Sequence, residues 1–99
     1  MRVLITGGRT PFALHLTRLF HVAGHEVTVT DSERHSVARF TRFKARFVQT
    51  ANARFARAQF EADLTALIDD VQPDLILPSC EELFYVRALL DRIGWQGDF

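Results

Sequence analysis

Short apolar runs alternate along the chain with longer stretches in which apolar residues recur at helical spacing. The short runs are rich in β-branched residues and predict strands at 2–6, 26–30, 45–48 and 75–77. The longer stretches predict amphipathic helices at 11–23, 60–71 and 79–93. Residues 33–44 are expected to form a basic loop with a short helix, and residues 50–57 a polar loop. This alternation predicts an α/β fold, with a doubly wound parallel sheet of about four strands in a three-layer α/β/α arrangement. The chain of 99 residues allows one domain, expected to span residues 1–99.

The first helix carries signals at both of its ends. Thr10 is a suitable N-cap, Pro11 suits the first helical position, and Gly24 suits the position after the last turn. The apolar face of this helix is predicted to consist of Phe12, Leu16, Leu19, Phe20 and Ala23.

The carboxyl ends of parallel strands form the edge at which such sheets bind ligands. Four segments are expected to meet there, namely 7–11, 31–34, 49–52 and 78–82. The candidate site residues in these segments are Gly7, Gly8, Arg9, Thr10, Asp31, Ser32, Ser79, Cys80, Glu81 and Glu82.

The turn after the first strand contains part of a nucleotide-binding fingerprint. In dehydrogenases and epimerases of the short-chain type the pattern is Thr-Gly-x-x-Gly-x-x-Gly, because the glycines let the backbone approach a pyrophosphate. After Thr6 and Gly7, the next two glycine positions are occupied by Thr10 and Ala13. Two interpretations stay open: an anion site at the helix N-terminus beside Arg9, or a turn that only requires small residues.

The other candidate segments also allow two interpretations each. Asp31 follows the second strand, where an acid holds the ribose hydroxyls of a dinucleotide, but Asp31-Ser32 is also a common loop start. Ser79 and Glu82 match the S-x-x-E capping box, which leaves Glu81 free to face a ligand. Cys80 has no histidine near it in the sequence to activate it, so we expect it to be buried and inert.

Charge is unevenly distributed along the chain. Residues 1–60 contain ten Lys/Arg and three Asp/Glu, whereas residues 61–99 contain two and nine. An anionic ligand or partner, or complementarity between the halves, would explain this asymmetry. Residues 34–57 interleave basic and phenylalanine side chains, as polyanion-binding grooves do, although the phenylalanine spacing favours core packing. We therefore do not expect nucleic acid to be the main partner.

Several classes of function are disfavoured by composition. A single cysteine excludes an internal disulfide and a cysteine-built zinc site, and the histidines lack ligand spacing, so we expect no metal. No apolar run approaches the length of a membrane span, and the N-terminus is not typical of a signal peptide. We expect a cytoplasmic protein without a membrane partner.

Three segments together resemble the N-terminal pre-ATP-grasp domain of ATP-grasp proteins, in the carbamoyl-phosphate-synthase-like or carboxylate–amine-ligase-like group. They are RVLITGGRTPFALHLTRLFHVAGHEVTVTDS, RFTRFKARFVQTANARF and DLILPSCEELFYV. The resemblance implies a Rossmann-like domain on the substrate side of a ligase. That ligase would activate a carboxylate of a small-molecule substrate as an acyl phosphate for attack by an amine, with ATP and Mg²⁺ held by later domains. It also implies that Arg9 faces an anionic group and Glu81 an amine.

The chain ends at Phe99, where the resemblance implies a further strand and the ATP-binding region. We therefore expect this fragment to hold no cofactor and no catalytic residue and to be inactive alone. Its partners would be the remaining ATP-grasp domains, in cis or as a split subunit, and its exposed faces would favour self-association. Two alternatives remain. One is an NAD(P)-binding Rossmann module of the epimerase or dehydrogenase type, and the other is a polyanion- or RNA-binding module.

Overall fold

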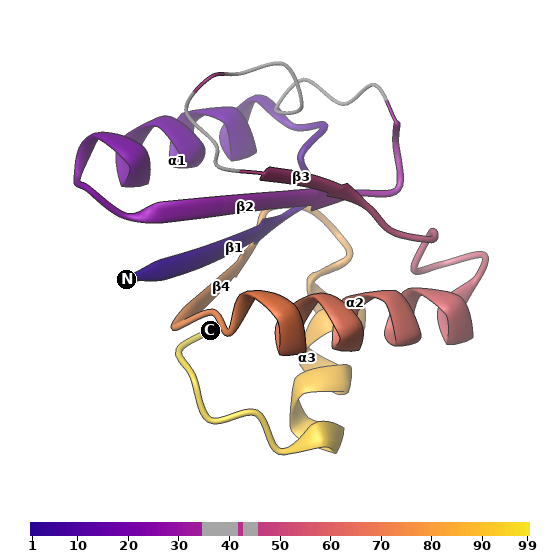
Figure 1. The fold of residues 1–99 in the computed structure, drawn as a ribbon. Helices are drawn as coiled ribbons and strands as arrows, with labels where there is room; N and C mark the ends of the chain where they lie inside the picture. The colour runs from indigo at the N-terminus through magenta and orange to yellow at the C-terminus, as the bar shows by residue number, and fades with distance from the viewer. Residues whose placement is uncertain (35–41, 43–45) are drawn as a thin grey trace.

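The computed structural model describes residues 1–34, 42 and 46–99, and its fold is shown in Figure 1. Four strands form one parallel sheet with the order β3-β2-β1-β4. The strands are β1 (Arg2–Thr6), β2 (Glu26–Asp31), β3 (Arg46–Gln49) and β4 (Leu75–Pro78). The helices are α1 (Pro11–Val22), α2 (Arg57–Val71) and α3 (Leu83–Ile93). The predicted α/β class and its parallel, Rossmann-like sheet are confirmed.

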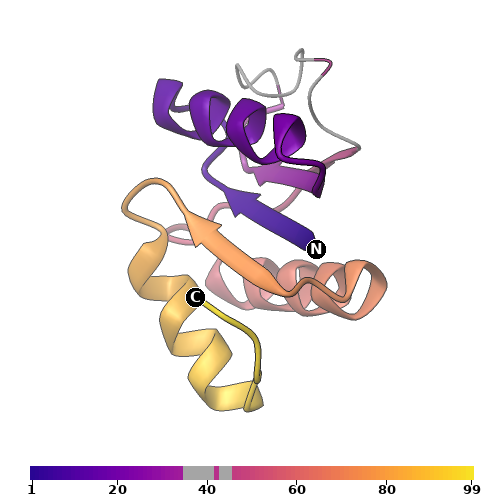
Figure 2. The same cartoon turned by 90° about the vertical axis from the view of Figure 1, so that its left-hand side faces the viewer.

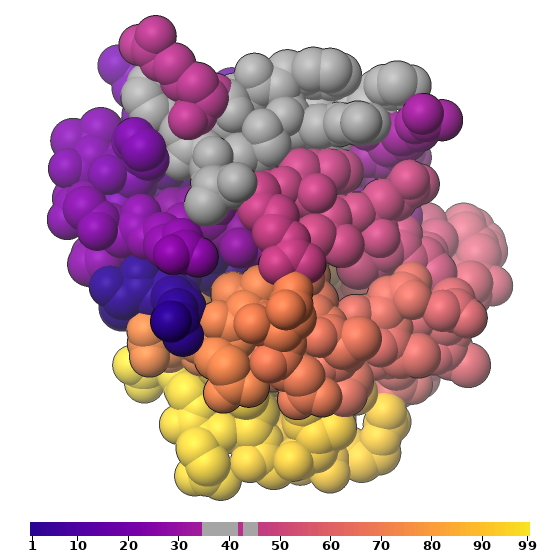
Figure 3. All heavy atoms as spheres, viewed as in Figure 1, coloured from indigo at the N-terminus to yellow at the C-terminus, as the bar shows by residue number. Residues whose placement is uncertain are grey.

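The sheet separates two apolar clusters. Helix α1 covers one face, and helices α2 and α3 cover the other (Figures 1 and 2). Because side chains alternate across a strand, Val3 and Ile5 pack toward α1, whereas Leu4 packs toward α2 and α3. In the space-filling view, α2 (pink to orange) and the C-terminal residues (yellow) form one continuous side of the molecule (Figure 3).

The orientation of α1 differs from the predicted one. Ala13 and Thr17 are the buried positions, whereas Phe12, Leu19 and Ala23 are exposed, so the prediction was wrong for these three. Small side chains let α1 lie close to the sheet. The buried Thr17 hydroxyl donates a hydrogen bond to the Ala13 carbonyl at 2.7 Å. Leu16 and Phe20 pack at the margin of this cluster as expected.

Two helices begin at other residues than predicted. Helix α2 begins at Arg57 rather than at residue 60, and α3 begins at Leu83 rather than at Ser79. The later start of α3 has a physical reason, since the Ser79 hydroxyl donates to the carbonyl of Thr6 at 2.7 Å and belongs to the strand ends. Most of the predicted loop and short helix at 33–44 lies outside the described residues.

The outer edge of β4 is partly covered by the C-terminal segment. The Ile76 amide donates to the Asp98 carbonyl at 2.9 Å, and Leu75 and Asp98 form an isolated parallel bridge. Among the described residues, no helix is both long enough and apolar enough to cross a membrane.

Candidate functional site

A cavity of about 390 Å³ opens at the carboxyl ends of the strands. It lies on the face of the sheet that α2 and α3 cover. Thr6 points to the same face as Leu4, which packs against these helices, and Thr6 and its register partner Thr30 both line the cavity. Its lining comes from four segments, within residues 6–9, 30–32, 50–55 and 80–85, together with Phe60 of α2. Small-molecule sites commonly enclose about 300–1,000 Å³, so the cavity is large enough for a nucleoside-sized ligand.

The structure brings seven of the ten candidate residues into this lining: Gly7, Arg9, Asp31, Ser32, Cys80, Glu81 and Glu82. The other three, Gly8, Thr10 and Ser79, belong to the same loops but do not line the cavity. Cys80 is half-buried rather than buried, and Glu81 is exposed at the mouth.

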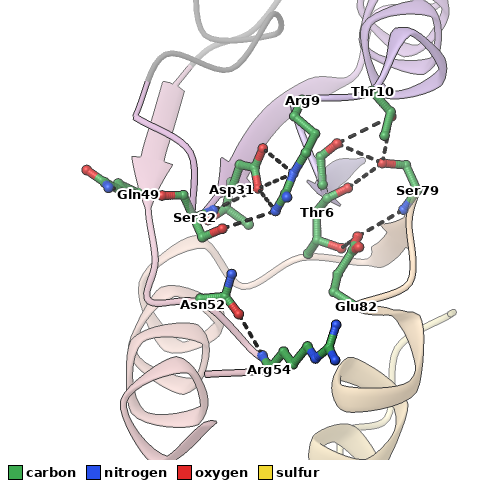
Figure 4. A network of polar contacts seen from close by, with 12 residues as sticks. Thr6, Arg9, Thr10, Asp31, Ser32, Gln49, Asn52, Arg54, Ser79 and Glu82 are labelled. Carbon is green, nitrogen blue, oxygen red and sulfur yellow. Dashed lines mark hydrogen bonds and ion pairs between the residues drawn. The ribbon is translucent and has the colours of Figure 1, made fainter. Parts of the chain in front are cut away.

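An ion pair joins the first two strand ends across the cavity (Figure 4). Arg9 Nη2 lies 2.8 Å from Asp31 Oδ1 and 3.0 Å from Ser32 Oγ, and Arg9 Nε lies 3.2 Å from both carboxylate oxygens. The Asp31 side chain is 2% exposed and that of Arg9 is 44% exposed. The hydrogen bond to Asp31 raises the pKa of Arg9, against a smaller lowering by partial burial. Arg9 therefore stays protonated, and its charge compensates a nearly buried carboxylate.

The glycine turn, residues 7–10, is tied to β4 by its own polar groups. Gly7 adopts φ +76, and a Cβ at this position would lie 2.6 Å from Glu82 Oε1 and 2.7 Å from Ser79 Oγ. Thr10 Oγ1 donates to Ser79 Oγ at 3.1 Å and accepts the Ala13 amide at 3.0 Å. The glycine therefore makes room for neighbouring side chains of this chain, and Thr10 caps α1 as predicted.

The loop before α3 contains half of the predicted capping box. Glu82 Oε1 accepts the Ser79 amide at 3.2 Å and the Thr6 hydroxyl at 2.8 Å. The other half is absent because the Ser79 hydroxyl donates to carbonyls of Thr6 and Gly7 instead. Glu82 thus links β1 to the start of α3 and helps to shape the inner wall of the cavity.

Residues 50–55, here called the aromatic loop, were predicted only as a polar loop, yet they supply the largest part of the lining. Asn52 Oδ1 accepts the amides of Arg54 and Phe55 at 2.8 and 3.1 Å, and the Ala51 amide donates to Asp63 Oδ2 at 2.8 Å. These bonds fix the backbone of the loop. The available signal was the asparagine itself, which favours such side-chain-to-backbone turns.

A metal centre is not evident in the part of the chain that the structure describes, where no three His, Cys, Asp or Glu side chains come together. Part of the basic stretch 34–57 that suggested polyanion binding, residues 35–41 and 43–45, lies outside the described residues. The described basic residues of this stretch include Arg46, which pairs with Asp70, and Arg57, which pairs with Glu61.

The fold and the site define the class of protein as a Rossmann-like α/β module with a cavity at its strand ends. A solved structure with this fold is UDP-glucose-4-epimerase from Stenotrophomonas maltophila, described with bound NAD and formylated UDP-arabinopyranose. It superposes with a TM-score of 0.70 and 23% sequence identity, over 97% of this chain and 35% of the epimerase chain. At this identity the similarity concerns the fold.

The resemblance to ATP-grasp proteins is corrected by these comparisons. No family model matches the chain, and no match is found among curated proteins. The solved structure described above is an NAD-bound epimerase rather than an ATP-grasp ligase. The resemblance rested on the order of strands, turns and helices, which any Rossmann-like domain shares, so the assignment as a carbamoyl-phosphate-synthase-like ligase domain was wrong.

Proposed function

We propose that this chain is an NAD(P)-binding module of the epimerase or dehydrogenase type and that it holds the adenosine part of the dinucleotide in the strand-end cavity. The observation that carries this proposal is the Asp31 carboxylate, which lies at the end of β2 and lines the cavity. An acid at this point of a Rossmann fold accepts hydrogen bonds from ribose hydroxyls.

The bonding of Asp31 leaves capacity for a ribose. Its Oδ1 atom accepts from the Ser32 amide at 2.7 Å and from Arg9, whereas Oδ2 has only the 3.2 Å contact with Arg9 Nε among the described residues. A carboxylate oxygen accepts two hydrogen bonds. Oδ2 therefore has capacity for a ribose hydroxyl, and because the Asp31 side chain is only 2% exposed, Arg9 would have to shift to let the hydroxyl reach it.

The glycine turn is less suited to a pyrophosphate than the three-glycine fingerprint. Pro11 has no amide hydrogen, and the Ala13 amide is already bonded to Thr10 Oγ1. The positive charge that balances the pyrophosphate would come from side chains instead of backbone amides. Arg9 is half-exposed, and Arg54, which has no ion pair with any described residue, lines the same cavity. With few amide donors we expect a dissociation constant of about 10 µM to 1 mM.

The NAD-bound epimerase supports this location through its fold only. The chain spans only 35% of the length of that protein. The proposal therefore concerns cofactor binding and assigns no chemical step to a residue of this chain.

The test is a titration of the protein with NADH and NADPH, followed by nicotinamide fluorescence. We expect saturable binding, and at least about fivefold weaker binding of NADH by Asp31→Asn, since a charge-assisted hydrogen bond to the ribose is weakened. Asp69→Asn is the matched control because Asp69 is exposed on α2 and does not line the cavity. Absence of binding of both dinucleotides at about 1 mM would refute the proposal.

A further inference from the structure

Two phenylalanines stand at the cavity with most of their surface exposed. Phe55 of the aromatic loop is 80% exposed and Phe84 of α3 is 74% exposed, the highest values among the large apolar side chains that the structure describes. They come from different elements, yet both line the cavity. Single exposed apolar residues are common on protein surfaces, but two aromatic rings that line one cavity are typical of a ligand site.

We propose that Phe55 and Phe84 form a stacking subsite for the purine base of the bound nucleotide. This inference rests on the proposed function and adds the residues that recognise the base. The ring faces of phenylalanine are sequence-tolerant platforms for bases, because every base presents a π-face. Burial of the two rings by a base would remove their large apolar surface from water, which favours binding.

Both rings are carried by backbone that is already held in place. The amide of Phe55 is bonded to Asn52 Oδ1, and the Arg54 guanidinium lies 5.2 Å from the centroid of the Phe55 ring. This cation–π contact covers part of the ring and restrains its orientation. Phe84 lies in the first turn of α3, which packs on the core through Val86, Leu89 and Leu90. Little ordering of the site is therefore needed when the base binds.

A candidate hydrogen-bond donor for the base, the Asn52 amide, lines the same cavity as the two rings. The oxygen of the Asn52 amide is bonded within the loop, so its orientation is defined. Figure 4 shows the amide nitrogen of Asn52 turned toward the side of the cavity that holds Ser32 and Arg9. From there it would donate to a ring nitrogen of a purine, while Asp31 holds the ribose. Base, ribose and phosphate would then meet aromatic, acidic and basic groups in turn.

The experiment measures binding of AMP by calorimetry to the wild-type protein and to Phe55→Ala and Phe84→Ala. We expect each variant to weaken AMP binding about 5- to 100-fold, whereas Phe55→Trp retains wild-type affinity within about threefold. Phe12→Ala is the matched control, because Phe12 is 55% exposed on α1 and does not line the cavity. The affinity for ribose 5-phosphate, which has no base, should stay within about twofold in the same variants.

The outcomes separate this inference from the proposed function. If the wild-type protein binds NADH but both alanine variants bind AMP within twofold of wild type, the stacking subsite is refuted and the proposed function stands. The same conclusion follows if the substitutions change only self-association, measured by sedimentation. If the wild-type protein binds neither NADH nor AMP, both proposals fail.

Discussion

The glycine turn and the aromatic loop lie at the same edge of the sheet but differ in how their polar groups are used. In the glycine turn, the Thr10 hydroxyl and the Gly7 carbonyl are bonded to Ser79, and Glu82 fills the space beside Gly7. In the aromatic loop, the Asn52 amide oxygen organises the backbone, while the Phe55 ring projects outward with 80% of its surface exposed.

This difference distinguishes a turn that connects the ends of β1 and β4 from a loop that we propose binds the ligand. The turn with the recognisable glycines is the part that holds β1 and β4 together, and its donors are largely occupied. The loop without a sequence motif offers an aromatic face and a cation. If the two proposals hold, the glycine motif does not mark the residues that contact the base, and the predictions below test this contrast.

The largest effect is expected at Gly7. In Gly7→Ala the new Cβ would lie 2.6 Å from Glu82 Oε1, and the alanine would have to keep the backbone angle φ of +76. We therefore expect a loss of about 2–4 kcal/mol in the free energy of unfolding. Gly24→Ala is the control, because Gly24 has φ +91 but no atom within 4 Å of the new Cβ. Its cost should be about 1–2 kcal/mol from backbone conformation alone. Urea unfolding compares the two, and equal losses would mean that the close approach to Glu82 is unimportant.

The two neighbouring glutamates provide the next contrast. Glu82→Ala removes the acceptor of the buried Thr6 hydroxyl and the Ser79 amide, so we expect a loss of about 1–3 kcal/mol in unfolding free energy. Glu81→Ala should stay within about 0.5 kcal/mol, because Glu81 is exposed. Thermal unfolding of both variants measures this difference. If Glu82→Ala is as stable as Glu81→Ala, the hydrogen bonds of Glu82 to Thr6 and Ser79 do not stabilise the connection between β1 and β4.

Arg9 belongs to the glycine turn but also lines the cavity, so we expect it to influence the choice between NADH and NADPH. An arginine near the end of β2 accommodates the 2′-phosphate of NADPH, and Arg9 is half-exposed beside Ser32. We expect Arg9→Gln to weaken NADPH binding about tenfold more than NADH binding. Arg87→Gln on α3 is the control, since Arg87 does not line the cavity. Equal losses for both dinucleotides in fluorescence titrations would exclude this role.

The smallest expected effect concerns pH. Asp31 raises the pKa of Arg9, and a raised pKa gives a contribution to stability that is lost only when the pH rises through the folded-state value. That value lies far above neutrality for an arginine. The difference in unfolding free energy between the wild-type protein and Arg9→Gln should therefore be constant from about pH 7 to 9. A steady decline over this range would show that another titrating group controls the pair.

Sequence patterns predicted the elements of this fold well because the apolar periods are strong. Starts and faces were harder to predict. The hydroxyl of Ser79 is used by β1, 73 residues away in sequence, and α1 turns the small Ala13 rather than Phe12 toward the sheet. Such choices depend on contacts that form only when the layers assemble.

The site was predictable as a location but not as a set of contacts. Parallel strand ends correctly indicated where Arg9 and Asp31 lie. Their pairing across 22 positions could not be read from spacing. Phe84 was not among the candidates, and Phe55 lies in the stretch 34–57 for which core packing was favoured. An aromatic residue in a loop or helix is usually part of a core, and only the exposed fractions distinguish these two.

The central claim is that a nucleotide binds on the α2 and α3 face of the strand ends. The most direct measurement is ¹H–¹⁵N NMR of the labelled protein during a titration with NAD⁺. We expect the largest shift changes at the amides of residues 31–32, 50–55 and 80–85, which line the cavity. Unchanged spectra at about 5 mM NAD⁺, or changes confined to α1 away from the strand ends, would contradict the account.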